Sequence, residues 1–453
     1  MNISQDHSRR SPCGPILVDQ RIDAGWIIPV EPEGQVLEKH SLVLEGDLIR
    51  DLLPTSEASV RYSARHHMRL EQHVLMPGLV NLHTHAAMSL LRGFADDLPL
   101  MRWLQERIWP AENRLMSPEF VRDGTELACW EMLRGGTTCF NDMYFFPEAA
   151  AEGALAAGMR AALGITVFEF PSAYGRHAAD YLEKGMQTRA HFNDSPLISF
   201  CLAPHAPYTV ADRTFERVGQ LADEFDLPIH LHVHETADEI NGSLKEYSVR
   251  PLSRLHRLGL LSPRLIAVHA VHLERDEIDL LAAGGCHIAH CPTSNMKLAS
   301  GIAPVKELLD RGIGIGLGTD GAASNNRLDM FREMHHAALL AKVASHAPTV
   351  LPAHTALRMA TLDGARALGL DDKIGSLKPG KKADLAAIDL GDWPLQPCYD
   401  PASHLVHVAG REQVSHVWVN GQLRIEDKRP CGVDMRSLLD KVEIWQNNAL
   451  VVA

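Results

Sequence analysis

Two histidines stand two positions apart at the end of an apolar run, and this spacing suggests metal chemistry. The segment 81–85, Asn-Leu-His-Thr-His, follows the apolar residues 74–80. In a β-strand, positions i and i+2 face the same way, so His83 and His85 could bind one metal ion. A lone His-x-His also occurs often by chance, so the pair alone is only a hypothesis for a metal site.

A second run, Ile229 to Glu235, alternates histidine with aliphatic residues over three periods. In a strand this pattern directs the three imidazoles to one face. The last inward positions lie nearest a site at the strand end, so we expect His232 to be a third ligand and Glu235 to lie beside it. His230 is deeper in the strand and is interpreted as a core histidine.

His269 and Asp320 end two further apolar runs. A carboxylate at a buried strand end is costly to ionise unless a positive charge compensates it, and a metal ion would do so. The alternative for Asp320 is a helix-capping or turn carboxylate. Three imidazoles and one carboxylate suit a divalent transition metal with an open position for water, most simply Zn²⁺, with Fe²⁺ or Mn²⁺ as alternatives. Such an ion lowers the pKa of water to about 7, as hydrolysis at neutral pH requires.

The elements that must position these residues alternate between short β-rich runs and longer helical patterns from about residue 72 to residue 370. Eight runs end at residues 83–85, 140–142, 164–166, 203–205, 232–235, 268–269, 290–292 and 318–320. Helical patterns lie between them, for example at 118–134, 148–157, 210–225, 274–283 and 304–311. Eight βα units predict an α/β fold, a parallel (β/α)8 TIM barrel whose chemistry lies at the carboxyl ends of the strands.

The two flanks of the barrel contain short strands with turns and no helices in this interpretation. Neither flank could make a core alone, so we expect residues 15–70 and 373–432 to pair into one composite β-sandwich. Residues 71–372 then form the metal-dependent barrel, and 433–453 form a C-terminal tail with a helix over 435–447. The polar first fourteen residues are expected to be disordered.

Composition narrows the classes of partner. The 453 residues are 45% hydrophobic, enough for a substantial core, and the net charge is −13 with no dense cluster of Lys or Arg. This excludes a nucleic-acid surface and favours small molecules. The eight cysteines are scattered and read as reduced thiols, and no signal peptide or membrane-spanning stretch is visible, so a cytoplasmic location is expected.

With these residues assembled, the chain resembles the amidohydrolase superfamily, and within it the deaminase and chlorohydrolase branch that includes 5′-methylthioadenosine/S-adenosylhomocysteine deaminases. The resemblance covers nearly the whole chain. It runs through segments 76–85, 204–208, 232–235, 269–272, 292–298, 318–326 and 375–385. No lysine lies between Lys184 and Lys245, so the carboxylated lysine of two-metal relatives is missing and the resemblance implies a mononuclear site.

The resemblance also implies roles for the catalytic residues. His83, His85, His232 and Asp320 match the metal ligands, and Asp320 would also take a proton from the attacking water. Glu235 matches the residue that protonates the ring nitrogen and helps ammonia leave. His269 matches a histidine that hydrogen-bonds the attacking hydroxide.

Three further residues match substrate contacts of such relatives. His205 would hydrogen-bond a purine nitrogen, Glu112 would bind ribose hydroxyls, and Arg176 would be one of two arginines for the carboxylate of S-adenosylhomocysteine. Glu112 could instead be a solvated acid at a helix start. At the second arginine position, near Ile165, no arginine stands.

A missing arginine would weaken carboxylate recognition, so we expect 5′-methylthioadenosine or adenosine to be preferred over S-adenosylhomocysteine. The stretch from Arg92 to Arg107 could be an apolar lid over the 5′ group or simple loop packing.

The expected activity is therefore hydrolytic deamination of a purine nucleoside to the inosine analogue and ammonia. The alternatives are deamination or dechlorination of another heterocycle, such as guanine or an s-triazine, and a non-catalytic ligand-binding barrel. The resemblance leaves room for a homo-oligomer.

Overall fold

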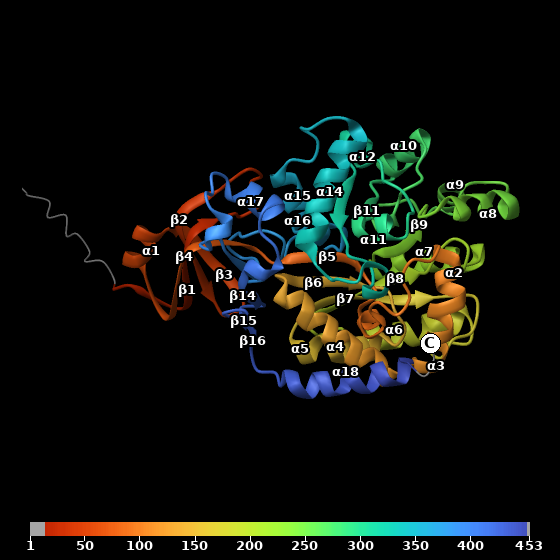
Figure 1. Cartoon of the computed structure of the whole chain (residues 1–453), viewed down its shortest axis with the longest axis horizontal. Helices are drawn as coiled ribbons and strands as arrows, with labels where there is room; N and C mark the ends of the chain where they lie inside the picture. The colour runs from red at the N-terminus through yellow and green to blue at the C-terminus, as the bar shows by residue number, and fades with distance from the viewer. Residues whose placement is uncertain (1–13, 451–453) are drawn as a thin grey trace, which may run out of the picture.

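Within residues 14–450, which this computed structural model describes, the strands form two eight-stranded sheets (Figure 1). The barrel sheet has the order β12-β11-β10-β9-β8-β7-β6-β5, and its paired strands are parallel. Its strands are β5 Leu79–Thr84, β6 Thr137–Asp142, β7 Arg160–Val167, β8 Ile198–Pro204, β9 Ile229–Val233, β10 Leu265–His269, β11 His287–His290 and β12 Gly314–Leu317. The predicted (β/α)8 barrel is confirmed.

Helices follow the strands and cover the barrel from outside (Figure 1). They are α4 Pro118–Arg134, α5 Pro147–Ala157, α6 Ala178–His191, α7 Asp212–Phe225, α8 Ala237–Tyr247, α9 Pro251–Arg257, α10 Arg275–Gly284, α11 Pro292–Lys297, α12 Val305–Asp310, α13 Ala322–Asn325, α14 Met330–Ser345, α15 Ala353–Met359 and α16 Leu362–Ala367. Local signals set their ends. The Ser117 hydroxyl caps α4 by accepting from the Phe120 amide, and Pro118 occupies the first turn, where its missing N–H costs nothing.

The barrel closes between β5 and β12 through side-chain and backbone hydrogen bonds. The Asn81 carboxamide accepts from the Thr319 amide at 2.9 Å and donates to its hydroxyl at 2.7 Å. The Asp320 amide donates to the carbonyl of His83 at 2.9 Å. These bonds bring the first and last strands together, and with them two of the predicted ligands.

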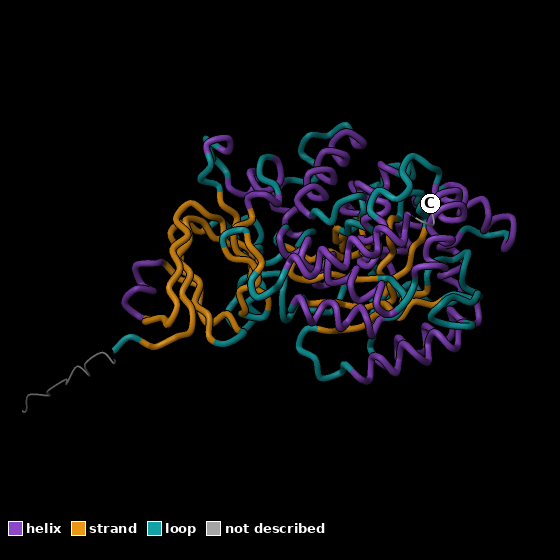
Figure 2. The backbone as a smooth tube through the Cα atoms, turned by 60° about the horizontal axis from the view of Figure 1, so that its bottom comes forward, coloured by secondary structure: helices purple, strands orange, loops and turns teal. Residues whose placement is uncertain are grey.

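Both ends of the chain build the second sheet, in the order β16-β15-β14-β13-β4-β1-β2-β3. Its strands are β1 Ile16–Ile27, β2 Leu37–Glu45, β3 Leu48–Pro54, β4 Tyr62–Pro77, β13 Leu385–Asp389, β14 Val414–Val419, β15 Gln422–Glu426 and β16 Arg429–Pro430. The two flanks pair as expected, where β13 lies antiparallel to β4. Hydrogen bonds join all the strands into one mixed sheet, which curls over a core that includes Leu42, Leu75 and Trp418 (Figure 2).

Three features of the flanks differ from the prediction or refine it. Two short helices, α1 Thr55–Arg61 and α17 Pro401–His407, lie where only strands and turns were expected. Strand β4 continues to Pro77, past the predicted boundary at residue 70, and leads almost directly into β5. The division into domains stays a prediction.

The predicted tail helix is present as α18, Met435–Leu450, which runs along α4 (Figure 1). The Trp445 indole donates to the Asp123 carboxylate at 3.0 Å and packs edge-on against Phe120. No helix within residues 14–450 is long and apolar enough to cross a membrane. The described cysteines, seven of the eight, are free thiols. The expectation about the first fourteen residues falls almost wholly on residues 1–13, which lie outside the described part.

Candidate metal centre and active site

The four predicted ligands converge at the carboxyl end of the barrel. The Nε2 atoms of His83 and His232 lie 3.2 Å apart. The Asp320 Oδ1 atom lies 3.4 Å from His83 Nε2 and 3.3 Å from His85 Nε2. The donor atoms of His83, His85 and His232 all lie within 4.8 Å of one another, as do those of His83, His269 and Asp320.

Each of the three imidazoles predicted as ligands is held through its other ring nitrogen. Nδ1 of His85 donates to the Met143 carbonyl at 2.6 Å, and Nδ1 of His232 donates to the His205 carbonyl at 2.8 Å. Nδ1 of His83 lies 2.9 Å from Nε2 of His230. The carbonyl partners place the proton of His85 and His232 on Nδ1, so their Nε2 lone pairs point into the cluster. His83 presents its Nε2 lone pair there in the tautomer in which its Nδ1 donates to His230.

This arrangement fits a four-coordinate divalent ion. Two Nε2 lone pairs that face each other at 3.2 Å repel unless a cation lies between them. Metal–nitrogen bonds of about 2.05 Å at a tetrahedral angle would place two ligand nitrogens about 3.3 Å apart. Burial lowers the pKa of His83 to about 4 and the pKa of His232 well below its usual value, so both rings are in the neutral form that binds metal.

The side chains of Glu235 and His269 lie beside the four predicted ligands. The Glu235 carboxylate lies 3.8 Å from Nε2 of His269, and burial raises the pKa of Glu235. The Asn295 carbonyl oxygen accepts from Nδ1 of His269 at 2.9 Å, which leaves Nε2 facing Glu235 as an acceptor. A carboxyl with a raised pKa is suited to hold a proton and release it during a reaction.

The backbone is left-handed at two of these positions, with φ of 70° at His269 and 63° at Asp320. Non-glycine residues rarely adopt this conformation, and it is retained where surrounding contacts fix it. At Asp320 the contacts are the Ser294 hydroxyl, which donates to Oδ2 at 2.6 Å, and the Gly321 amide, which donates to Oδ1 at 2.7 Å. The carboxylate is therefore oriented before any ligand arrives.

A cavity of about 340 Å³ opens from the cluster, and both polar and apolar side chains line it. The segment after β5 covers it with α2 Leu100–Trp103, a π-helical turn Leu104–Ile108 and α3 Trp109–Leu115. Trp103 and Leu104 line the cavity, whereas Phe94, Leu98 and Met101 of the same segment pack against the core. The other apolar lining residues include Leu100, Ile108, Trp109, Met116, Phe145, Phe168 and Phe170.

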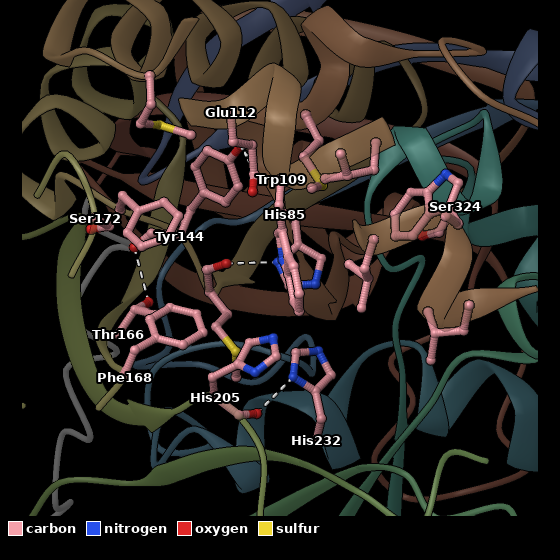
Figure 3. Close-up of a pocket in the computed structure, with 18 of the residues that line it drawn as sticks. His85, Trp109, Glu112, Tyr144, Thr166, Phe168, Ser172, His205, His232 and Ser324 are labelled. Atoms are coloured by element: carbon pink, nitrogen blue, oxygen red, sulfur yellow. Dashed lines mark hydrogen bonds between the residues drawn. The ribbon is translucent and has the colours of Figure 1, made fainter. Parts of the chain in front are cut away.

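Glu112 and His205 both line this cavity, on opposite sides of His85 (Figure 3). The Tyr144 hydroxyl donates to Glu112 at 2.7 Å, and burial raises the pKa of Glu112 to about 7. Burial lowers the pKa of His205 to about 3, so its imidazole is neutral. Glu112 is buried, not a solvated acid at a helix start.

Of the predicted site residues, Arg176 alone lies neither in the cluster of predicted ligands nor in the cavity lining. Its side chain is 80% exposed and forms an ion pair with Asp180 at 3.2 Å. Ile165, near the second expected arginine position, is fully buried. Among the described residues that line the cavity, none is a lysine or an arginine.

Three residues that support the site were not identified from the sequence. His230 is fully buried, as expected of a core histidine, and it also contacts the predicted ligand His83 through Nε2. Ser294 and Asn295, both on α11, hold Asp320 and His269. The only signal for this pair was their place in segment 292–298, which carried part of the resemblance.

Fold and site together define a (β/α)8-barrel hydrolase with a candidate metal centre at the carboxyl ends of its strands. A sequence model of the amidohydrolase family matches residues 74–424, so the chain belongs to that family.

Individual relatives agree with this assignment. The chain is 46% identical over 429 residues to the 5-methylthioadenosine/S-adenosylhomocysteine deaminase of Teredinibacter turnerae, covering 95% of this chain and 97% of that protein. It is 45% identical over 428 residues to the protein of the same name from Saccharophagus degradans, covering 94% and 96%.

Two solved structures resemble this protein. An adenosine deaminase from Xanthomonas campestris with bound zinc has a TM-score of 0.95 and 47% identity, covering 96% of this chain and all of that one. The zinc complex of an atrazine chlorohydrolase from Arthrobacter aurescens has a TM-score of 0.86 and 25% identity, covering 94% of this chain and all of that one.

Proposed function

We propose that this protein is a zinc-dependent aminohydrolase that converts adenosine-type nucleosides, 5′-methylthioadenosine foremost, to the inosine analogue and ammonia. Fe²⁺ or Mn²⁺ could replace zinc on the same ligands. The observation that carries the proposal is the cavity, which joins the cluster of His83, His85, His232 and Asp320 to a buried carboxyl, Glu112. The two relatives named as deaminases of these nucleosides support it.

The chemistry follows from the groups beside the cluster. A zinc ion, when bound, supplies the Lewis acidity that activates water at neutral pH. Asp320 accepts one proton of the attacking water, and His269 hydrogen-bonds the water as its oxygen approaches C6 of the purine. Glu235 gives its proton to the ring nitrogen. The C6–O bond forms, the C6–N bond breaks, and the amino group leaves as ammonia with the proton that Asp320 held. The C6 hydroxyl then gives its proton to Glu235, which leaves a C6 carbonyl and restores the carboxyl group.

The rest of the cavity suits the nucleoside. The neutral imidazole of His205 can hydrogen-bond a purine nitrogen, and the carboxylate form of Glu112 can accept hydrogen bonds from two ribose hydroxyls. Aromatic and aliphatic side chains of the covering segment can pack against an apolar 5′ substituent.

The same lining favours a methylthio group over an amino-acid tail. A charged 5′ substituent would meet apolar side chains and no lining guanidinium, and Arg176 lies in solvent beside Asp180. Desolvating a carboxylate without such a partner is costly. We therefore propose that kcat/KM for 5′-methylthioadenosine exceeds that for S-adenosylhomocysteine.

The test is an ultraviolet assay of the zinc-loaded protein with 5′-methylthioadenosine, adenosine, S-adenosylhomocysteine, guanine and an s-triazine. We expect turnover of the nucleosides in the order given. The resemblance to the atrazine chlorohydrolase makes the triazine the strongest competitor. Turnover of guanine or the triazine alone would reject the nucleoside proposal, and faster turnover of S-adenosylhomocysteine than of 5′-methylthioadenosine would reject the ranking. The cytoplasmic location and a homo-oligomeric state stay predictions.

A further inference from the structure

Glu239 lies outside the cavity lining, yet its buried carboxyl group contacts the strand end that carries Glu235. One oxygen accepts from the His234 amide and the other from the Glu235 amide, each at 2.9 Å. The Glu239 side chain is buried on the first turn of α8.

This contact is not the ordinary role of a glutamate at this helix position. In Thr236-Ala-Asp-Glu239 the Thr236 hydroxyl caps α8 by accepting from the Glu239 amide at 3.3 Å. A standard capping box would return the Glu239 side chain to the amide of Thr236. Here the side chain reaches further back, to the two residues that follow the ligand strand β9.

The backbone at that point needs support. His234 has a φ of 57°, in the left-handed region that a residue with a Cβ avoids. Its imidazole is fixed by the His272 carbonyl at 3.1 Å and by the Leu252 amide at 3.1 Å. The turn at His234 redirects the chain after β9, so the two amides that Glu239 holds determine where the Glu235 carboxylate points.

We propose that Glu239 is a positioning residue for the deamination, because it fixes the backbone of Glu235 so that this carboxyl faces His269 and the substrate. The inference rests on the proposed function for the role of Glu235. It assigns Glu239 no contact with substrate or metal.

The test compares Glu239→Gln with Glu246→Gln, an exposed glutamate on the same helix. Glutamine keeps the size and one acceptor oxygen, but its NH₂ group cannot accept from the second amide. We expect kcat of Glu239→Gln to fall about ten- to hundred-fold, with KM within about two-fold and zinc content unchanged, as for a support of a reacting group. Glu246→Gln should match the unaltered protein.

A double variant separates positioning from general damage. If Glu239 acts through Glu235, Glu239→Gln should cost less than about two-fold in a Glu235→Gln background. Full additivity, or a single variant as active as Glu246→Gln, would overturn the proposal.

Amide hydrogen exchange of His234 and Glu235 gives a readout that needs no substrate. The amides should be protected in the unaltered protein and exchange faster in Glu239→Gln. Unchanged exchange would show that Glu239 does not fix this backbone. That result would reject the positioning role even if the substrate panel had already rejected the proposed function.

Discussion

The Nε2 atoms of His83 and His232 face each other at 3.2 Å, on strands β5 and β9 that lie far apart in the sequence. Each ring is fixed through Nδ1, so neither can turn to relieve the approach. In the tautomer in which Nδ1 of His83 donates to His230, the barrel thus holds two lone pairs at the separation that a shared ion requires.

His232→Ala should lower zinc affinity by removing one of these donors. Zinc per chain after dialysis against a weak chelator should fall from about one to near zero, with His256→Ala, which alters an exposed histidine on α9, as the control. Zinc at about a thousand times its Kd should stabilise the unaltered protein by about 4 kcal/mol and stabilise His232→Ala far less. Full zinc retention by His232→Ala would remove this residue from the ligand set.

Glu235→Gln should separate metal binding from catalysis. The amide cannot deliver the proton that the ring nitrogen needs, so kcat should fall roughly 10²- to 10⁴-fold while zinc content stays unchanged. Glu224→Gln, on the exposed part of α7, is the matched control. A variant with near-normal kcat would exclude Glu235 as the proton donor.

The residues at three strand ends of the barrel could be predicted to meet from the sequence, because the fold fixes where parallel strands end. Parallel strands place their carboxyl ends at one edge, so His83, His232 and Asp320 had to lie near one another. The contact of His230 could not be predicted from its position in the strand, since only the structure shows that its Nε2 meets the Nδ1 of His83 on a strand that is not its neighbour in the sheet.

Loop geometry and short helices were not predictable in the same way. Arg176 lies in a loop before α6, and its guanidinium is drawn to Asp180 one turn further on rather than to the cavity. The helices α1 and α17 span seven residues each, too short for a helical period to emerge, and the single buried residue of α1 is Ala58.

Glu112 should give the protein a pH-dependent stability. Burial raises its pKa from 4.5 to about 7, so the folded state favours the neutral carboxyl. The stabilising contribution is full below about pH 4.5 and is lost as the pH rises through about 7, a change of about 3 kcal/mol. Glu112→Gln lacks this titration, so its unfolding free energy relative to the unaltered protein should increase by up to that amount between about pH 4 and about pH 8. Urea titrations at the two pH values measure the difference, and a difference independent of pH would contradict the assignment.

Trp103→Ala should weaken binding of the 5′ substituent. The indole lines the cavity and its Nε1 donates to the Ala95 carbonyl at 3.0 Å, which fixes the covering segment. We expect KM for 5′-methylthioadenosine to rise about ten-fold and KM for adenosine to rise less, because adenosine lacks the apolar group. Trp393→Ala, which alters an indole that is 83% exposed, is the control. Equal increases for the two nucleosides would show that Trp103 does not contact the 5′ group.

The most direct test of the central claim is the stoichiometry of ammonia release from 5′-methylthioadenosine by zinc-loaded protein and by chelator-stripped protein. The account predicts one ammonia for each inosine analogue formed with zinc, loss of turnover after stripping, and recovery when zinc is restored. Undiminished turnover without metal, or no ammonia from the zinc-loaded protein, would contradict it.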